Sequence, residues 1–284
     1  MTMASNKNIN QHITTVEDTV KICKAMEMIA TVKMRRAQDQ AIVGRPYVEK
    51  IGQVISNLAT QRQLQSRRFP LLNKREVKKI SIVHITTDRG LCGDLNDKLN
   101  HLVSDFILRQ TIPVSLITVG EKGKTFMHRI EQDIVAEFSG IGDHLSLLDS
   151  HPIAHIVMDA YTRAQVDLVY LAYVHFINTS VQQPVIEKLL PVDPPELLIG
   201  DGSEEYIWEP DAATVLGGLL PRYIEIRVYH AILELIASEQ SARMVAMRNA
   251  SDNATKMIEN LTLVMNRTRQ EAITNEICDI TRLT

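Results

Sequence analysis

The stretch that comes closest to a chemical site is TDRGLCGDLN, residues 87–96, a turn between an apolar run and a helical pattern. A doubly wound α/β domain holds a phosphate at this kind of turn. The spacing Gly90-x-x-Gly93 is not Gly-x-Gly-x-x-Gly, however, and the chain has no Walker A sequence. Asp88 and Asp94 would also repel a phosphate. We therefore expect a tight strand-to-helix turn rather than a nucleotide site.

Other reactive residue types are scattered. A helix N-terminus lowers the pKa of a nearby thiol. A catalytic role for Cys92 would also need a base and an oxyanion hole, and the sequence does not give their geometry. His84 and His175 lie in apparent strands, where packed histidines are the expectation. His151 and His155 have i,i+4 spacing but no third ligand. We expect no catalytic residue, no metal and no cofactor.

Composition is that of an ordinary globular chain. Among 284 residues, 45% are hydrophobic and 23% charged, and the net charge of −3 gives no reason to expect nucleic acid. Cys23, Cys92 and Cys278 are far apart, which favours a reducing compartment over a disulfide framework. The N-terminus lacks a secretory h-region, and no apolar run is long enough to span a membrane.

Both ends of the chain show coiled-coil spacing. A 4-3 apolar repeat runs from Ile9 to Leu58 and predicts one long helix, with a bend near Gly44–Pro46. The same repeat runs from Leu219 to Asn275, and Asp211 is the expected N-cap of this second helix. We expect the two helices to pair antiparallel, with Met244 and Met247 against the N-terminal helix.

The middle of the chain alternates strands and helices. Apolar runs predict strands at KKISIVHITT, IPVSLITVG and DLVYLAYVHF, and a hairpin follows the last. Helical patterns lie between them, at 95–110, 122–129 and 153–165. The expected fold class is α/β with long helical arms: a central Rossmann-like open sheet and an antiparallel coiled coil of the terminal helices. The expected divisions are 1–62, 75–195 and 210–284.

Three blocks carry a family resemblance. They are KICKAMEMIATVKMRRAQ (21–38), TTDRGLCGDLN (86–96) and the stretch 237–277, which begins ASEQSARMVAMRNASDNATKM. In this order they resemble the gamma subunit family of F-type ATP synthases, over essentially the whole chain. The bacterial type fits best, because the paired cysteines of the chloroplast insertion are absent.

The resemblance implies a central-stalk rotor without catalytic residues of its own. It would transmit rotation of the membrane c ring to the alpha/beta hexamer during ATP synthesis or hydrolysis. Its partners would be three alpha and three beta subunits, epsilon and the c ring. It would contact the membrane only indirectly, as a peripheral subunit on the cytoplasmic face of the bacterial inner membrane.

Motif by motif, the resemblance also implies contact residues. Those facing beta or the bearing of the hexamer would be Lys24, Met26, Glu27, Arg243, Arg269, Gln270, Thr274 and Glu276. The loop on the side of the c ring and epsilon would be Asp88, Arg89, Gly90, Leu91, Cys92 and Gly93. Two departures from the family bear on these sites: Cys23 replaces a usual Thr, and Asp94 replaces a usual Gly.

Two other classes compete with this interpretation. A non-catalytic coiled-coil scaffold with a Rossmann-like domain would homodimerise through its heptads. An α/β oxidoreductase or transferase with helical arms would need a phosphate loop and would have a ligand-dependent activity as an isolated chain. The rotor hypothesis predicts instead a single chain whose arms pair with each other and recruit alpha and beta.

Overall fold

The computed structural model describes residues 2–60, 69–141, 145–193 and 208–282. They belong to two compact units, one formed by Met1–Val32 with Arg243–Thr284 and the other by Lys33–Ala242. The expected division ends at 62 and 195 lie outside the described residues, as does most of the connector at 191–210. No helix in the described part of the chain is long and apolar enough to cross a membrane.

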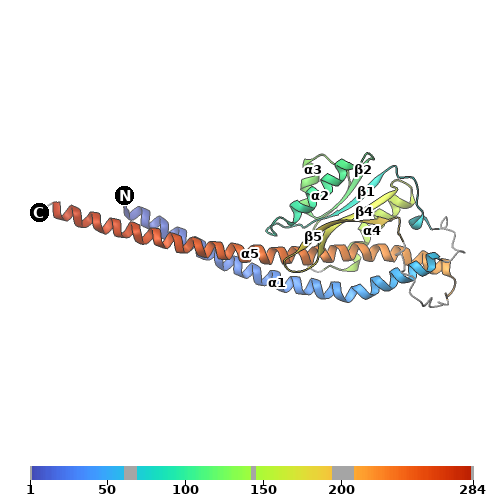
Figure 1. Ribbon diagram of the computed structural model, residues 1–284, viewed down its shortest axis with the longest axis horizontal. Helices are drawn as coiled ribbons and strands as arrows, with labels where there is room; N and C mark the ends of the chain where they lie inside the picture. Colours follow the sequence, from blue (N-terminus) through green and yellow to red (C-terminus); the bar gives the residue numbers. More distant parts are fainter. Residues whose placement is uncertain (1, 61–68, 142–144, 194–207, 283–284) are drawn as a thin grey trace. The chain divides into compact units, whose positions relative to one another are not determined.

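Two long helices form the ends of the chain. Helix α1 spans Thr2–Thr60 and α5 spans Ala212–Arg282 (Figure 1). Helix α1 remains helical through Pro46, so the proline does not divide it. The expected N-cap is confirmed: Asp211 Oδ1 accepts the Thr214 backbone N–H at 2.9 Å, which satisfies a donor that the first helical turn would otherwise leave free.

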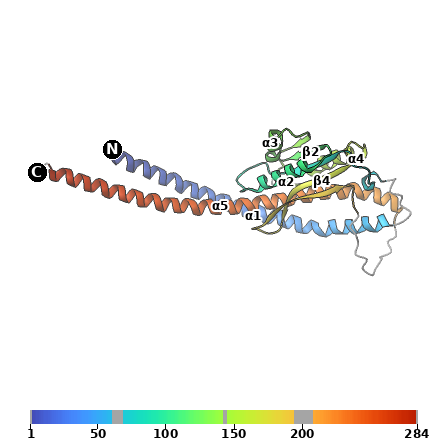
Figure 2. The same cartoon turned by 45° about the horizontal axis from the view of Figure 1, so that its top comes forward.

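In the unit formed by the two chain ends, the helices run antiparallel (Figure 2). Their least exposed side chains recur every third or fourth residue, which confirms the coiled-coil seam. Those on α1 are Ile9, Ile13, Val16, Val20, Cys23, Glu27 and Ala30. Those on α5 are Met244, Met247, Ser251, Ala254, Ile258, Leu261, Met265, Thr268 and Ala272.

One ion pair fixes the register of this seam. The Arg248 Nε donates to Glu27 Oε1 at 2.9 Å, from α5 to α1. Because the helices are antiparallel, one turn back along α1 and one turn forward along α5 place Cys23 level with Ser251. Cys23 is 8% exposed and Ser251 3%, so small side chains fill the seam at this level.

The other unit is built on a five-stranded sheet in the order β3-β2-β1-β4-β5. Strands β1, β2, β3 and β4 are parallel, and β5 is antiparallel to β4. The strands are β1 (Ile80–Ile85), β2 (Val114–Val119), β3 (Ile134–Phe138), β4 (Leu168–Phe176) and β5 (Gln182–Leu190). The expected mostly parallel sheet with a terminal hairpin is confirmed, whereas β3 was not predicted from the sequence.

Helices cover both faces of the sheet (Figure 1). Helices α2 (Leu95–Arg109) and α3 (Glu121–Arg129) lie on one face, and the inner part of α5 lies on the other. Helix α4 (Leu147–Thr162) begins six residues before the predicted start, because Ser146 and Asp149 form a capping box. A short 3₁₀ helix, η2 (Pro70–Leu72), precedes β1.

Polar contacts attach α5 to the hairpin strands. Ser238 Oγ donates to the Val174 carbonyl of β4 at 3.3 Å, and Arg227 Nη2 donates to Glu187 of β5 at 2.9 Å. Apolar residues of α5 such as Ile224 and Val228 are completely buried beside them. The inner half of α5 is therefore part of the core of the α/β unit rather than a free arm.

Candidate functional site

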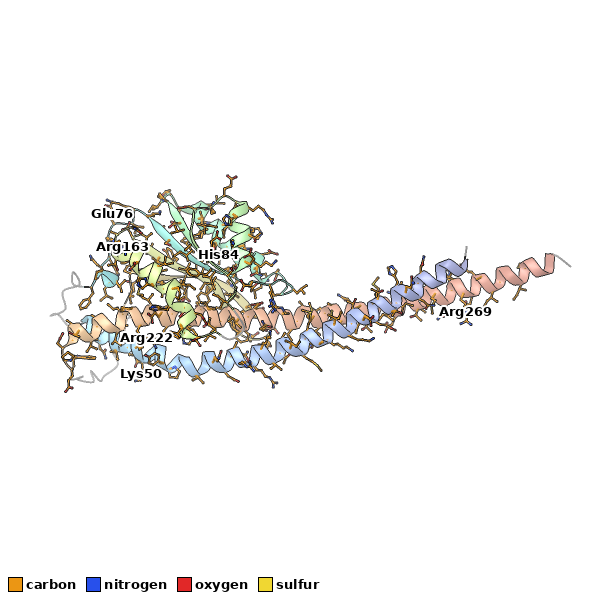
Figure 3. All side chains as sticks on the ribbon, turned by 180° about the vertical axis from the view of Figure 1, so that it is seen from behind. Lys50, Glu76, His84, Arg163, Arg222 and Arg269 are labelled. Atoms are coloured by element: carbon orange, nitrogen blue, oxygen red, sulfur yellow. The ribbon has the colours of Figure 1, made fainter. Side chains whose placement is uncertain are left out.

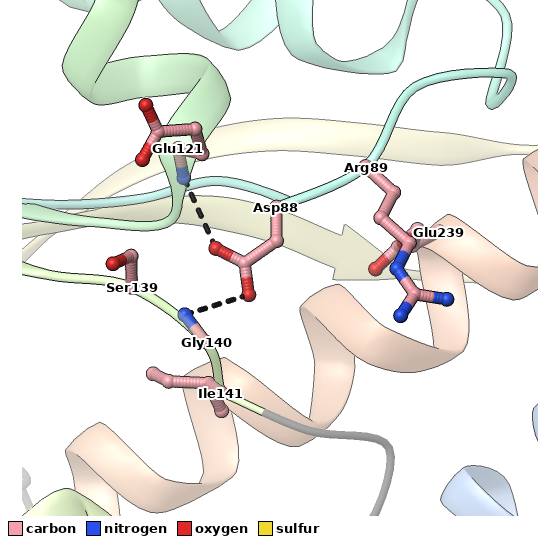
Figure 4. Close-up of a pocket in the computed structure, with 7 residues that line it drawn as sticks. All are labelled: Asp88, Arg89, Glu121, Ser139, Gly140, Ile141 and Glu239. Atoms are coloured by element: carbon pink, nitrogen blue, oxygen red, sulfur yellow. Dashed lines mark hydrogen bonds between the residues drawn. The ribbon is translucent and has the colours of Figure 1, made fainter.

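Asp88 ties three segments together at the carboxyl end of the sheet. It follows β1, and its two carboxylate oxygens accept the backbone N–H groups of Glu121 and Gly140, each at 3.1 Å (Figure 4). Glu121 is the first residue of α3, and Gly140 follows β3. A helix N-terminus attracts anions, and here that anion is a side chain of the chain itself.

The rest of the predicted loop forms a tight turn into α2. The Thr87 hydroxyl donates to the Arg89 carbonyl at 2.7 Å, and both Leu91 and Gly93 have φ of 64°. Leu91 is 63% exposed, whereas the Cys92 side chain is buried. Figure 4 shows Arg89 extending towards Glu239 of α5. The expectation of a strand-to-helix turn is confirmed.

Sequence reasoning missed the residue that organises this turn. Asn96 Oδ1 accepts the Thr87 N–H at 3.2 Å, while Asn96 Nδ2 donates to Thr87 Oγ1 at 2.8 Å and contacts Cys92 Sγ at 3.4 Å. Its position one residue into α2 was the available signal, because Asn at a helix start commonly bonds to nearby backbone.

We expect Asp88→Asn to lower the free energy of unfolding by about 1–2 kcal/mol, because an amide accepts with one oxygen where the carboxylate uses two, and hydrogen bonds to a charged group are the stronger kind. Asp94→Asn is the matched control. Asp94 forms an ion pair with Lys98 on the surface of α2, at 2.9 Å, and its loss should change stability by less than about 0.5 kcal/mol. Chemical denaturation of both variants measures the difference. Equal effects would contradict the bridging role of Asp88.

Of the two histidines expected to be packed, His84 is buried, whereas the His175 side chain is 40% exposed. His84 is completely buried on β1 (Figure 3), and burial lowers its pKa to about 3, so it is neutral at physiological pH. His175 Nδ1 lies 2.5 Å from Glu234 Oε2 of α5. His151 pairs with Glu225 of α5 at 2.9 Å. Within the described residues, no group of three His, Cys, Asp or Glu side chains could hold a metal ion.

The predicted contact residues of the coiled coil have different environments. Lys24 is exposed and Met26 is half-buried on α1. Glu27 is held by Arg248, as described above. Arg243 is only 8% exposed, which makes it part of the packing of this chain. Of these four side chains, Lys24 is the most accessible to another protein.

The remaining predicted contacts lie near the C-terminal end of α5. Arg269, labelled in Figure 3, is exposed, as are Gln270 and Thr274. The Thr274 hydroxyl donates back to the Gln270 backbone carbonyl at 2.9 Å, so this bond does not involve the side chain of Gln270. The helix includes Glu276, whose side chain lies outside the described residues.

The structure thus defines a chain with a doubly wound α/β domain and terminal helices that pair antiparallel. Its fold is similar to a central stalk and c-ring structure of the mitochondrial ATP synthase of Tetrahymena thermophila, with a TM-score of 0.63 and 27% identity, over 81% of this chain and 99% of that one. A rotor structure of the Euglena gracilis enzyme shares the fold with a TM-score of 0.67 at 18% identity, over 95% and 99% of the two chains.

Sequence comparison identifies the family. A family model described as ATP synthase matches residues 5–282. An ATP synthase gamma chain of Dehalococcoides mccartyi is 52% identical over 98% of this chain and 97% of the relative. One from Polynucleobacter asymbioticus is 43% identical over 98% of both. The chain belongs to the ATP synthase gamma chain family.

Proposed function

We propose that this chain is the central-stalk rotor subunit of an ATP synthase. It transmits rotation of the membrane c ring to the catalytic alpha/beta hexamer and carries out no chemistry itself. Its partners are the three alpha and three beta subunits, epsilon and the c ring. In this proposal the chain works at the cytoplasmic face of a bacterial inner membrane, as a peripheral subunit.

The observation that carries the proposal is the outer surface of the coiled coil. Side chains of the two helices fill the seam between them. Several large apolar side chains outside the seam nevertheless remain exposed, which is typical of a surface that contacts another protein. Their exposed fractions are 60% for Ile22, 73% for Met28, 54% for Ile29, 68% for Leu263 and 51% for Val264. A shaft inside a ring of subunits accounts for such an arrangement on both helices.

The proposed division of labour follows the sequence divisions. Segments 1–62 and 210–284 supply the shaft through their outer parts, while their inner parts belong to the same compact unit as residues 75–195. The domain 75–195 engages epsilon and the c ring through Asp88, Arg89, Gly90, Leu91, Cys92 and Gly93. The hydrogen bonds of Asp88 and Asn96 support this, because they tie the loop to α2, α3 and the segment after β3.

Affinity purification of the tagged chain from membranes tests the assignment. Three alpha and three beta subunits for each tagged chain are expected, with ATPase activity in the complex and none in the free chain. Recovery of the chain as a homodimer without alpha or beta would favour the scaffold alternative, and a ligand-dependent activity of the free chain would favour the enzyme alternative.

We expect Arg269→Ala combined with Gln270→Ala to lower coupled ATP turnover by about five- to tenfold, because loss of two contacts at an interface costs about 1 kcal/mol or more. The thermal stability of the isolated chain should change little, since both side chains are exposed. Arg267→Ala is the control: it removes the same charge from the same helix, but Arg267 already pairs with Glu271 at 3.1 Å. Turnover equal to that of the control would remove both residues from the contact surface.

A further inference from the structure

A second polar site lies beside the turn after β1, between α2 and α3. It is a cavity of about 300 Å³ in the α/β unit. The residues that matter for its chemistry are Cys92, Asn96, Asn100, Lys122, Phe126 and Arg129. At about 30 Å³ for each water molecule in the liquid, this space exceeds what a few ordered waters fill.

Two cations converge on this cavity from α3. Lys122 and Arg129 are seven residues apart, which places them on the same face of the helix, two turns apart. Both are exposed, and neither forms an ion pair with any residue that the structure describes. The other basic residues of α3 behave differently, because Lys124 and His128 both pair with Glu137 of β3.

A buried amide lies on the wall of the same cavity. Asn100 of α2 is 2% exposed, and its Oδ1 has no hydrogen-bond partner among the described residues. A buried acceptor without a partner is rare and costs about 1–3 kcal/mol. The cavity is therefore lined by two positive charges from α3 and by a hydrogen-bond acceptor from α2, Asn100 Oδ1, that has no donor in the described part of the chain.

Carboxylates near the cavity leave its charge positive. The residues that line the cavity include one carboxylate, that of Asp97, and two cations, those of Lys122 and Arg129. Asp94 pairs with Lys98, and the Asp88 carboxylate is bound to the N–H groups of Glu121 and Gly140. A phosphate in the cavity would therefore not occupy the α3 N-terminus, where the Asp88 carboxylate already accepts the Glu121 backbone N–H.

We propose that this cavity binds a small oxyanion that carries its own hydroxyl, namely free hydrogen phosphate. Lys122 and Arg129 would donate to its charged oxygens, with the guanidinium suited to paired contacts. Its P–OH group would donate to Asn100 Oδ1. The cavity shares Gly90, Leu91, Cys92 and Gly93 with the loop assigned to epsilon and the c ring. Phosphate binding by the isolated chain nevertheless does not depend on the proposed function.

Titration of the purified full-length chain with inorganic phosphate by calorimetry tests this proposal. Saturable binding of one phosphate for each chain is expected. Sulfate has the same shape and charge but no hydroxyl, so it should bind at least about tenfold more weakly. Methyl phosphate above its second pKa of about 6 also lacks a P–OH group and should behave like sulfate, which separates free phosphate from a phosphate ester.

Variants of the lining complete the test. Lys122→Gln with Arg129→Gln should weaken phosphate binding at least about tenfold, whereas Arg109→Gln, which removes an exposed charge from α2 outside the cavity, should leave it unchanged. Asn100→Asp keeps the shape and should also abolish binding, because a carboxylate repels the anion. The proposal is wrong if phosphate does not bind, if sulfate binds equally well, or if the double variant binds like the unaltered chain.

Discussion

Gly120→Ala is expected to lower the free energy of unfolding by at least about 3 kcal/mol, the largest effect of any substitution considered for this chain. Gly120 joins β2 to α3 with φ of 97° and ψ of 144°, a conformation that essentially only glycine adopts. An added Cβ would lie 2.1 Å from the Thr86 carbonyl oxygen, which is backbone and cannot rotate away. Either α3 or the end of β1 would have to move.

Gly93→Ala separates the two causes. Gly93 also has positive φ, 64°, but an added Cβ would meet no atom within 4 Å. It should cost about 1 kcal/mol from backbone strain alone. Denaturant unfolding of the two variants measures the difference, and equal losses would show that the close approach of Thr86 is not what requires glycine.

Cys23→Asp is expected to disrupt the coiled coil, with a loss of at least about 2 kcal/mol, because a carboxylate would be buried in the seam without a partner. Cys23 is 8% exposed at the level of Ser251, and the nearest ion pair on the seam is the one already formed between Glu27 and Arg248. The loss should appear as lower helical content in circular dichroism at temperatures where the unaltered chain is folded.

Ile22→Asp is the matched control for the seam. It introduces the same charge one residue away, at a position that is 60% exposed. Helical content of the isolated chain should be retained. Loss of helix in both variants would mean that burial in the seam is not the reason for the effect at Cys23.

The long helices were predictable because their signal is repetitive. The 4-3 spacing of apolar residues extends over many turns, and each turn adds independent support for the same face. In the structure, that face of α1 is half-buried from Ile9 to Val20 and is buried at Cys23 and Ala30. The central strands β1, β2 and β4 were also predictable, because buried parallel strands are continuous apolar runs.

Strand β3 was missed because it is short and lies at the edge of the sheet. Its residues Ile134, Ala136 and Phe138 are half-buried, while Val135 and Glu137 point outward. Ala and Glu both have low strand propensity, and they mask the alternation of two. Because the outward-facing Val135 is also apolar, the five residues show no alternation of polar and apolar types that would identify the strand.

The contacts of the loop could not be deduced from spacing. Asp88 binds the backbone of Glu121 and Gly140, which are 33 and 52 residues further along the chain. The sequence indicated only that its charge opposes a phosphate. Arg243 shows the same limit, because its motif match implied a contact with beta or the bearing but gave no indication that the side chain is only 8% exposed in the chain itself.

Single-molecule rotation tests the central claim most directly. A reporter attached through Arg109→Cys, at an exposed position on α2, would be followed in complexes whose alpha/beta hexamer is immobilised. The rotor assignment predicts ATP-driven rotation in one direction with three equally spaced dwells in each turn, one for each beta subunit. Normal ATP hydrolysis with a stationary reporter would contradict it.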